Sequence, residues 1–238
     1  MLWYLASLQV CTTQRDALLS IRNQTNPDSW IALANWGSNL SVCEWERVEC
    51  NAGGFVVGLN LSGVGLQGAI PDNITCLPFL KSLYLNDNAI NAAFPADVCD
   101  LVALQYLQIN NAGLTGNIPD CICNMNFTKY LYLENNSLDG AIPTCVGNMT
   151  ELMEIHLTCN ELEGTIPTGF NTLPHLTEVR FNCNDNLDCT SELATRPNFI
   201  FVCGDVDCEN CTHINPSQCP HSVDVPGCGT YYSPIYSF

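Results

Sequence analysis

The sequence predicts an α/β solenoid, in which short strands from successive 24-residue units stack into one parallel sheet. The first observation is that an aliphatic residue recurs every 24 positions, at Leu59, Leu83, Leu107, Leu131, Ile155 and Val179. The second is that another apolar residue follows two positions later in each unit, an alternation typical of a strand with one buried face. Because no unit can bury its leucines alone, each must pack on its neighbours, and the two ends need caps.

The composition indicates a secreted, disulfide-bonded protein. Lys and Arg number 7 against 24 Asp and Glu, so the net charge of −17 weighs against nucleic acid or an anionic membrane as partner. No apolar run is long enough for a membrane span. The 16 cysteines, together with the glycosylation sequons, indicate an oxidising compartment.

Four segments divide the chain. Residues 1–10 are apolar and are either a remnant of a secretion signal or a first helical turn that packs on the cap. Residues 11–55 form an N-terminal cap, and residues 56–188 hold the repeats. Residues 189–238 form a cysteine-rich C-terminal cap with an aromatic tail. The periodicity predicts strands near 58–62, 82–86, 106–110, 130–134, 154–158 and 178–182.

The repeats resemble a known family. The segments LYLENNSLDGAIP and IHLTCNELEGTIP are similar to the plant-type leucine-rich repeat, LxLxxNxLxGxIP, over residues 56–188. The resemblance implies a right-handed solenoid with a concave parallel sheet. It also implies a ladder of buried asparagines that bond neighbouring backbone, at Asn88, Asn136, Asn160 and Asn184, with Val64 and Ala112 breaking the ladder.

The two ends carry resemblances of their own. The N-terminal pattern from Cys11 to Cys50 resembles the cap of plant receptor-kinase ectodomains and polygalacturonase-inhibiting proteins, with Arg47 where glycine is usual. The pattern Cys203-x4-Cys208-x2-Cys211 resembles the end of some algal secreted leucine-rich-repeat proteins.

The cysteine spacing predicts disulfides. Residues 24 apart lie one above another in such a stack, roughly 5 Å apart, which is within the range that a disulfide spans. We therefore expect bonds between adjacent coils in the pairs Cys99–Cys123, Cys121–Cys145 and Cys159–Cys183. Cys43–Cys50 would close the N-terminal cap, and Cys11 and Cys76 remain to pair with each other.

Asn-x-Ser/Thr sequons predict N-linked glycans at Asn23, Asn39, Asn60, Asn73, Asn126, Asn135, Asn148 and Asn210. The repeat phase places Asn73, Asn126 and Asn148 on the outer side of the solenoid. Asn60 would point from the concave face and Asn135 would lie at its edge. Glycans at these two positions would shield part of the concave face.

The outward strand positions form a candidate binding surface on the concave face. Its predicted members are Tyr84, Tyr106, Gln108, Tyr130, Tyr132, Glu134, Glu154, His156 and Arg180. Exposed tyrosines among polar neighbours suit recognition of a peptide, protein or sugar, although tyrosine is also a favoured strand residue. His156 beside Glu134 and Glu154 reads as a solvated side chain, because no nucleophile accompanies it.

No motif predicts catalysis, a cofactor or a metal. Cys208, Cys211, His213 and His221 have metal-like spacing, but a cysteine-dense secreted tail favours disulfides. The alternating run 182–188 has oxygen ligands at calcium-loop spacing but lacks that loop's glycine and final glutamate. We therefore expect a protein that is not an enzyme.

The aromatic tail leaves two functions open. The side chains of Tyr231, Tyr232, Ile235, Tyr236 and Phe238 either fold back over the last coil or dock on another subunit. One hypothesis is a secreted, glycosylated, non-enzymatic module that binds an extracellular or cell-wall protein, peptide or polysaccharide. The alternative is a structural subunit that self-associates into an extracellular filament, coat or appendage.

Overall fold

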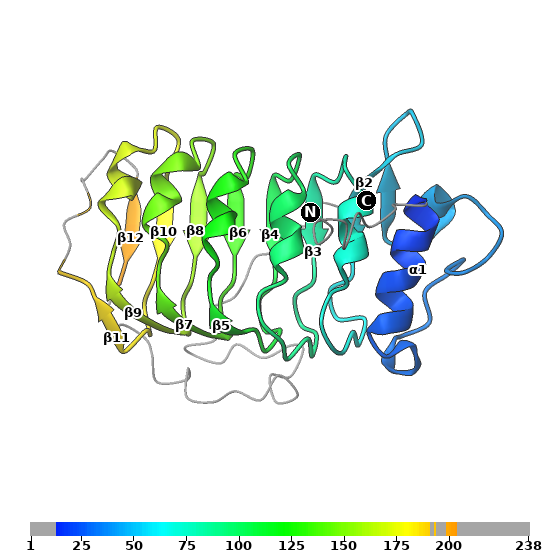
Figure 1. Ribbon diagram of the computed structural model, residues 1–238, viewed down its shortest axis with the longest axis horizontal. Coiled ribbons are helices and arrows are strands. Elements are labelled where there is room, and N and C mark those ends of the chain that lie inside the picture. Colours follow the sequence, from blue (N-terminus) through cyan, green and yellow to red (C-terminus); the bar gives the residue numbers. More distant parts are fainter. Residues whose placement is uncertain (1–12, 191–192, 194–198, 204–238) are drawn as a thin grey trace, which may run out of the picture.

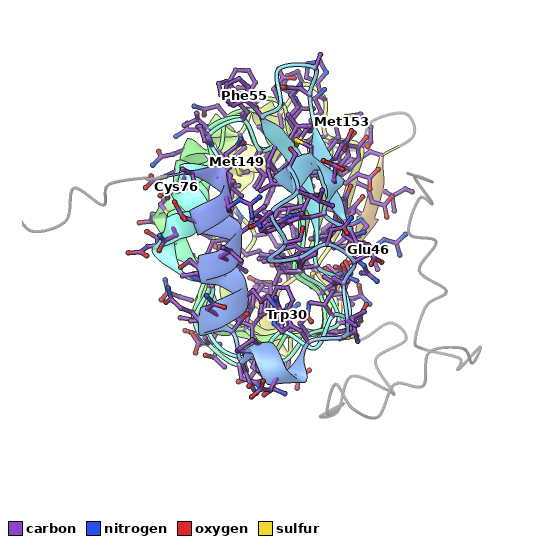
Figure 2. The ribbon with its side chains drawn as sticks, turned by 90° about the vertical axis from the view of Figure 1, so that its right-hand side faces the viewer. Trp30, Glu46, Phe55, Cys76, Met149 and Met153 are labelled. Carbon is purple, nitrogen blue, oxygen red and sulfur yellow. A yellow bond between two sulfur atoms is a disulfide. The ribbon has the colours of Figure 1, made fainter. Side chains whose placement is uncertain are left out.

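The chain winds into an elongated stack of coils (Figure 1). The computed structural model describes residues 13–190, 193 and 199–203. Helix α1 (Gln14–Gln24) lies across one end, and Figure 2 looks onto that end of the stack. The Thr13 hydroxyl caps the helix by accepting a hydrogen bond from the backbone N–H of Asp16. Ala17, Leu18 and Ile21 bury the inner face of α1 against the first coil.

A long sheet, which runs the length of the stack, confirms the predicted strands (Figure 1). Among the described residues it has eight strands, in the order β1-β2-β3-β4-β6-β8-β10-β12. From β2 onward the pairing is parallel, and neighbouring repeat strands pair residues 24 apart, as Leu83 pairs with Leu107. The bounds are β1 (Val48–Cys50), β2 (Val56–Asn60), β3 (Ser82–Tyr84), β4 (Tyr106–Gln108), β6 (Tyr130–Tyr132), β8 (Glu154–His156), β10 (Glu178–Arg180) and β12 (Ile200–Val202).

The long sheet is extended at both ends in ways that the repeat did not predict. Strand β1 comes from the N-terminal cap and pairs antiparallel with β2. Strand β12 lies in the segment 189–238, which we assigned to the cap and tail, and pairs parallel with β10. The disulfide Cys189–Cys203 ties this added strand to the last coil.

A second, short sheet lies on another side of the coils and was missed. Four strands are described in it, β5 (Thr115–Asn117), β7 (Ser137–Ala141), β9 (Glu161–Thr165) and β11 (Asn186–Asp188). Its first two pairs of strands join residues 22 apart, as Thr115 pairs with Ser137. Gly116, Gly140 and Gly164 have φ of 73°, 68° and 80°, a left-handed conformation that explains the glycine of the repeat.

Short 3₁₀ helices connect each short-sheet segment to the next long-sheet strand. In the repeats each begins after a proline, whose fixed φ suits a helix start. Their bounds are η3 (Asp72–Cys76), η4 (Ala96–Asp100), η5 (Asp120–Asn124), η6 (Thr144–Asn148) and η7 (Thr168–Thr172). Two more lie in the N-terminal cap, η1 (Pro27–Ser29) and η2 (Val42–Glu44).

Buried asparagines join the coils, as the resemblance implied. The Asn88 Oδ1 accepts from the backbone N–H groups of Gly65 and Leu66 at 3.1 and 2.9 Å. Its Nδ2 donates to the carbonyls of Leu61 and Leu85, at 2.7 and 2.9 Å. These two N–H groups and two carbonyls lie in turns, where the sheets provide no backbone partner. The Asn88 side chain supplies the hydrogen bonds that they would otherwise lack.

The same bonding recurs at Asn136, Asn160 and Asn184. Val64 and Ala112 are fully buried at the two positions where the ladder is broken.

Disulfides join the 3₁₀ helices of successive coils, but with a different pairing from the one predicted. Cys43–Cys50 closes the cap as expected. The pairs Cys99–Cys123 and Cys121–Cys145 were wrong, because the structure joins Cys99 to Cys121 and Cys123 to Cys145, each 22 residues apart. Cys76, Cys159 and Cys183 are also disulfide-bonded, but no bond joins Cys159 to Cys183 within the part of the chain described.

The corrected pairing has a geometric reason. Residues 24 apart project in parallel from successive coils, so their Cβ atoms stay about a strand spacing apart or more. A disulfide needs Cβ atoms about 3.5–4.5 Å apart. Away from the long sheet each coil is staggered by two residues on the next, as the short sheet also shows. The side chain that converges on Cys99 is therefore that of Cys121.

Replacing Asn88 with alanine should lower the free energy of unfolding by about 2–4 kcal/mol, because buried backbone groups of two coils lose their partners. Denaturant unfolding of the oxidised protein measures this. Asn117→Ala is the matched control, since Asn117 is exposed and makes one long hydrogen bond, and it should change stability by less than about 0.5 kcal/mol. Equal losses in the two variants would contradict a stabilising ladder.

Candidate binding face

An aromatic strip crosses neighbouring strands of the long sheet. It consists of Tyr106 on β4, Tyr130 and Tyr132 on β6, and His156 on β8. The rings of Tyr106 and Tyr130 stack with centroids 4.7 Å apart and planes 9° apart. Tyr132 stacks on the His156 imidazole at 4.6 Å, and Tyr130 and Tyr132 are 6.2 Å apart. The strip forms because the sheet register places Tyr106 opposite Tyr130 and Tyr132 opposite His156.

The other predicted members lie on the same face. Tyr84 pairs in register with Gln108, and Gln108 pairs with Tyr132. These side chains and the tyrosines of the strip are half-buried, whereas we expected exposed tyrosines. Each is flanked by a large side chain on an adjacent strand, which covers part of its surface. Arg180 is the exposed member, with 45% of its side chain accessible.

The expectation of a solvated His156 was wrong. Its side chain is only 12% exposed, and that of Glu134 is 1% exposed. Tyr132 covers one face of the imidazole. Glu134 lies near the end of β6, between Asn110 and Thr158 of the neighbouring coils in the repeat phase.

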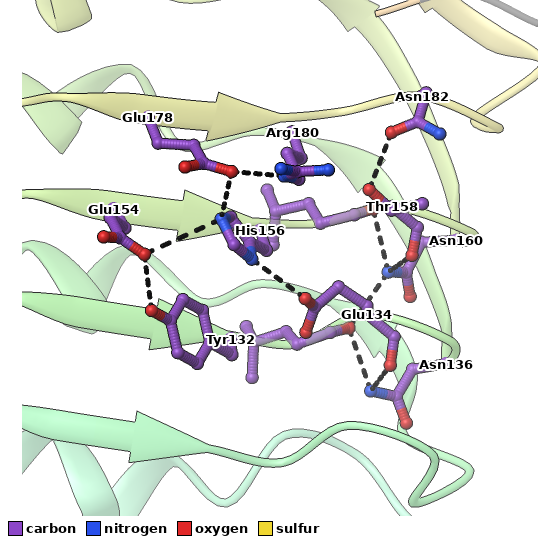
Figure 3. Close-up of polar contacts among 12 residues, drawn as sticks. Tyr132, Glu134, Asn136, Glu154, His156, Thr158, Asn160, Glu178, Arg180 and Asn182 are labelled. Carbon is purple, nitrogen blue, oxygen red and sulfur yellow. Dashed lines mark hydrogen bonds and ion pairs between the residues drawn. The ribbon is translucent and has the colours of Figure 1, made fainter. Parts of the chain in front are cut away.

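His156 is the centre of a carboxylate–histidine cluster, which we define as Glu134, Glu154, His156 and Glu178 (Figure 3). Its Nδ1 lies 3.0 Å from Glu134 Oε1. Its Nε2 lies 3.3 Å from Glu178 Oε1 and 3.9 Å from Glu154 Oε2, on the opposite side of the ring (Figure 3). Arg180 Nε donates to Glu178 Oε1. Three carboxylates therefore surround one imidazole.

Tyr132 is bonded into the cluster. Its hydroxyl donates to Glu154 Oε2 at 2.5 Å. Burial of the phenol, followed by the hydrogen bond to the Glu154 carboxylate, raises the pKa of Tyr132 far above its usual value of 10.0. The raised pKa favours the protonated hydroxyl, which is the form that donates to Glu154.

Glu178 is the member of the cluster that the sequence analysis did not select. It follows Glu154 by 24 residues, and the register pairs the two directly on β8 and β10. Extending the repeat phase of Glu154 by one unit would have found it.

The run 182–188, which the sequence analysis set aside as a calcium loop, has two of its side chains engaged elsewhere. The Asn184 amide takes part in the ladder, and Asn182 Oδ1 accepts a hydrogen bond from the Thr158 hydroxyl.

The sequons occupy several surfaces. Asn23, Asn39, Asn126 and Asn148 are exposed, while Asn60, Asn73 and Asn135 are half-buried. Asn73 and Asn148 lie on 3₁₀ helices, away from the long sheet, and Asn60 ends β2. Glycan occupancy at these positions remains a prediction.

Several predicted residues lie outside the described part of the chain. These are Cys11, the segment 1–10, Asn210, the metal-spaced Cys208, Cys211, His213 and His221, and the tail residues Tyr231, Tyr232, Ile235, Tyr236 and Phe238. The self-association that we predicted from the tail therefore stays a prediction. Within the described ranges, no helix has the length and apolar character needed to cross a bilayer.

Comparison with known families identifies the repeats and the cap. The Leucine rich repeat N-terminal domain family matches residues 11–51, and the Leucine Rich Repeat family matches residues 103–125 and 128–149. The receptor-like protein kinase BRI1-like 3 of Arabidopsis thaliana is 42% identical over 77 residues, which is 30% of this chain and 7% of that protein. The receptor-like protein kinase At3g47110 of the same plant is 35% identical over 77 residues, which is 32% of this chain and 8% of that protein. The chain thus spans less than a tenth of the length of these relatives.

Solved structures share the fold. The BIR2 ectodomain of Arabidopsis thaliana superposes with a TM-score of 0.67 at 28% identity, over 74% of this chain and 94% of that chain. The Arabidopsis receptor kinase HAESA, solved with the peptide hormone IDA and the co-receptor SERK1, gives 0.65 at 29% identity, over 71% and 29%. A plant ice-binding protein gives 0.67 at 27% identity, over 73% and 56%. The chain therefore shares the solenoid fold of these plant leucine-rich-repeat structures.

Because the native state holds the proton of Tyr132 and the unfolded state releases it near pH 10, stability should be intact below pH 10 and fall as the pH rises above it. Tyr132→Phe should flatten that fall, as seen in urea unfolding at pH 9 and pH 11. Absorbance titration at 295 nm gives an internal control. Up to pH 12 the native wild type and the native variant should show the same number of ionised tyrosines. In urea, where both are unfolded, the wild type should show one ionised tyrosine more than the variant. A difference of one tyrosine in the native proteins would contradict the burial of this phenol.

Proposed function

We propose that this chain is an extracellular, non-enzymatic recognition module that binds a peptide or an extended protein segment on the face of the long sheet. The aromatic strip is the observation that carries the proposal. Tyr106, Tyr130 and Tyr132 present large rings on adjacent rigid strands, already stacked on their neighbours. Such rings offer contact area at low cost in conformational entropy, because packing has fixed them before a partner arrives.

Fold neighbours and chemistry support a peptide partner. HAESA, which shares this fold, was solved with a peptide hormone and a co-receptor. The net charge of −17 favours a basic segment, since long-range attraction speeds encounter with an oppositely charged partner.

The disulfides and the predicted glycans support an extracellular location. All eleven cysteines in the described ranges are disulfide-bonded, and disulfides persist in oxidising compartments. The sequons on the 3₁₀-helix side leave the aromatic strip clear, so glycans at Asn73 and Asn148 would be compatible with binding on the long-sheet face.

A displayed library of random peptides, selected on the oxidised wild-type protein, tests the proposal. We expect selected peptides rich in Lys and Arg, with binding reduced at least about tenfold in the Tyr106→Ala, Tyr130→Ala double variant, because truncating packed aromatic contacts costs about 2 kcal/mol or more. Phe127→Ala is the matched control, since Phe127 is an aromatic side chain with 58% exposure that lies outside the strip.

Equal binding of the selected peptides to wild type, the tyrosine variant and the Phe127 control would contradict the proposed site. Thermal melting of both variants at neutral pH shows whether each one remains folded.

A further inference from the structure

We propose that Glu154, His156 and Glu178 form a binding site for a divalent transition-metal cation, Zn²⁺ foremost, on the long-sheet face. The proposal is independent of peptide binding, since it depends on the carboxylate–histidine cluster and not on the tyrosine pair of β4 and β6.

The three donor groups have the spacing that a metal requires. One ligand atom from each of Glu154, His156 and Glu178 can be chosen so that all lie within 4.8 Å of one another. Zinc binds imidazole nitrogen and carboxylate oxygen at about 2.0–2.2 Å, so two ligands of a tetrahedral ion lie about 3.3–3.6 Å apart. The Nε2 of His156 is 3.3 Å from Glu178 Oε1 and 3.9 Å from Glu154 Oε2. Only small side-chain movements would complete this geometry.

The His156 Nε2 is buried but has no hydrogen-bond partner. Although Glu178 Oε1 is 3.3 Å away, the contact does not have hydrogen-bond geometry. Most buried polar atoms in proteins are paired, so an unpaired imidazole nitrogen between two carboxylates needs an explanation. A bound cation would give His156 Nε2 a partner and would contact both carboxylates.

The groups behind the ligands match the surroundings of known metal sites. Metal-binding histidines usually donate their second N–H to a carboxylate, which fixes the tautomer and raises the basicity of the ligand. Here Glu134 Oε1 lies 3.0 Å from His156 Nδ1 and can accept that hydrogen bond. Tyr132 donates to Glu154 and holds the carboxylate in place.

The charge balance also favours a cation. Glu134, Glu154 and Glu178 bring three negative charges to the cluster, and Glu134 is 1% exposed. Arg180 supplies one positive charge, at Glu178. Buried carboxylates are costly unless they are paired or coordinate a metal, and a divalent ion would offset the two remaining charges. An imidazole ligand favours zinc and related transition metals over Ca²⁺ and Mg²⁺, which prefer oxygen.

Calorimetric titration of zinc chloride into the oxidised, EDTA-dialysed full chain tests the site. We expect one equivalent of Zn²⁺ to bind the wild type. His156→Gln and Glu178→Gln should each weaken binding at least about tenfold, and Glu134→Gln should weaken it by about 10–100-fold, since it removes the group that orients the histidine. His175→Gln is the matched control, because His175 is exposed and lies outside the cluster, and it should bind as the wild type does.

A second measurement separates binding at the cluster from binding elsewhere and from misfolding. The wild type and the His175 control should melt at a higher temperature with Zn²⁺ than without it, because a ligand that binds only the folded state stabilises it. The His156 and Glu178 variants, if folded, should lose this rise. Zinc binding that survives both variants, or that is lost instead in a His213→Gln, His221→Gln variant, would overturn the proposal, as would a wild type that binds no zinc at micromolar concentrations.

Discussion

The structure depends on a constant register between successive coils, and buried amides enforce that register. An apolar stack alone tolerates sliding, because one leucine packs on another almost equally well after a small shift. The hydrogen bonds of Asn88, Asn136, Asn160 and Asn184 are directional and bond the backbone of two coils at once. Sliding by one residue would leave these buried groups unpaired and would turn the strand side chains to the opposite face.

The same register creates the candidate binding face. Residues that are 24 positions apart become neighbours on adjacent strands of the long sheet. The side chains that occupy one position of successive repeats therefore form a row across the sheet. Tyr106 stacks on Tyr130, and Glu154 lies beside Glu178, for this reason. Because the scaffold below the row is rigid and apolar, its outward positions can change chemistry without changing the fold.

The carboxylate–histidine cluster places three acidic side chains close together on this face. Three acidic side chains converge on His156 at a depth where solvent no longer screens them fully. Such an arrangement raises the free energy of the folded chain unless a positive charge is present. Arg180 offsets part of the charge from outside. Sites that retain unfavourable local charge in an otherwise well-packed protein are commonly functional sites.

The sequence by itself determined the solenoid and the repeat strands of the long sheet, and its resemblance to plant leucine-rich repeats implied the Asn ladder with its two gaps. It also placed most side chains of the candidate binding face, although it missed Glu178. These features repeat at a fixed interval, so a linear pattern converts directly into spatial neighbours. Only the tertiary structure decided the disulfide pairing, the short sheet, the added strand β12 and the burial of His156 and Glu134. The reason is that the interval between vertical neighbours changes from 24 residues on the long sheet to 22 between β5 and β7 of the short sheet. The burial of a side chain such as His156 likewise depends on the side chains of its own coil and of the two neighbouring coils. No single repeat specifies that combination.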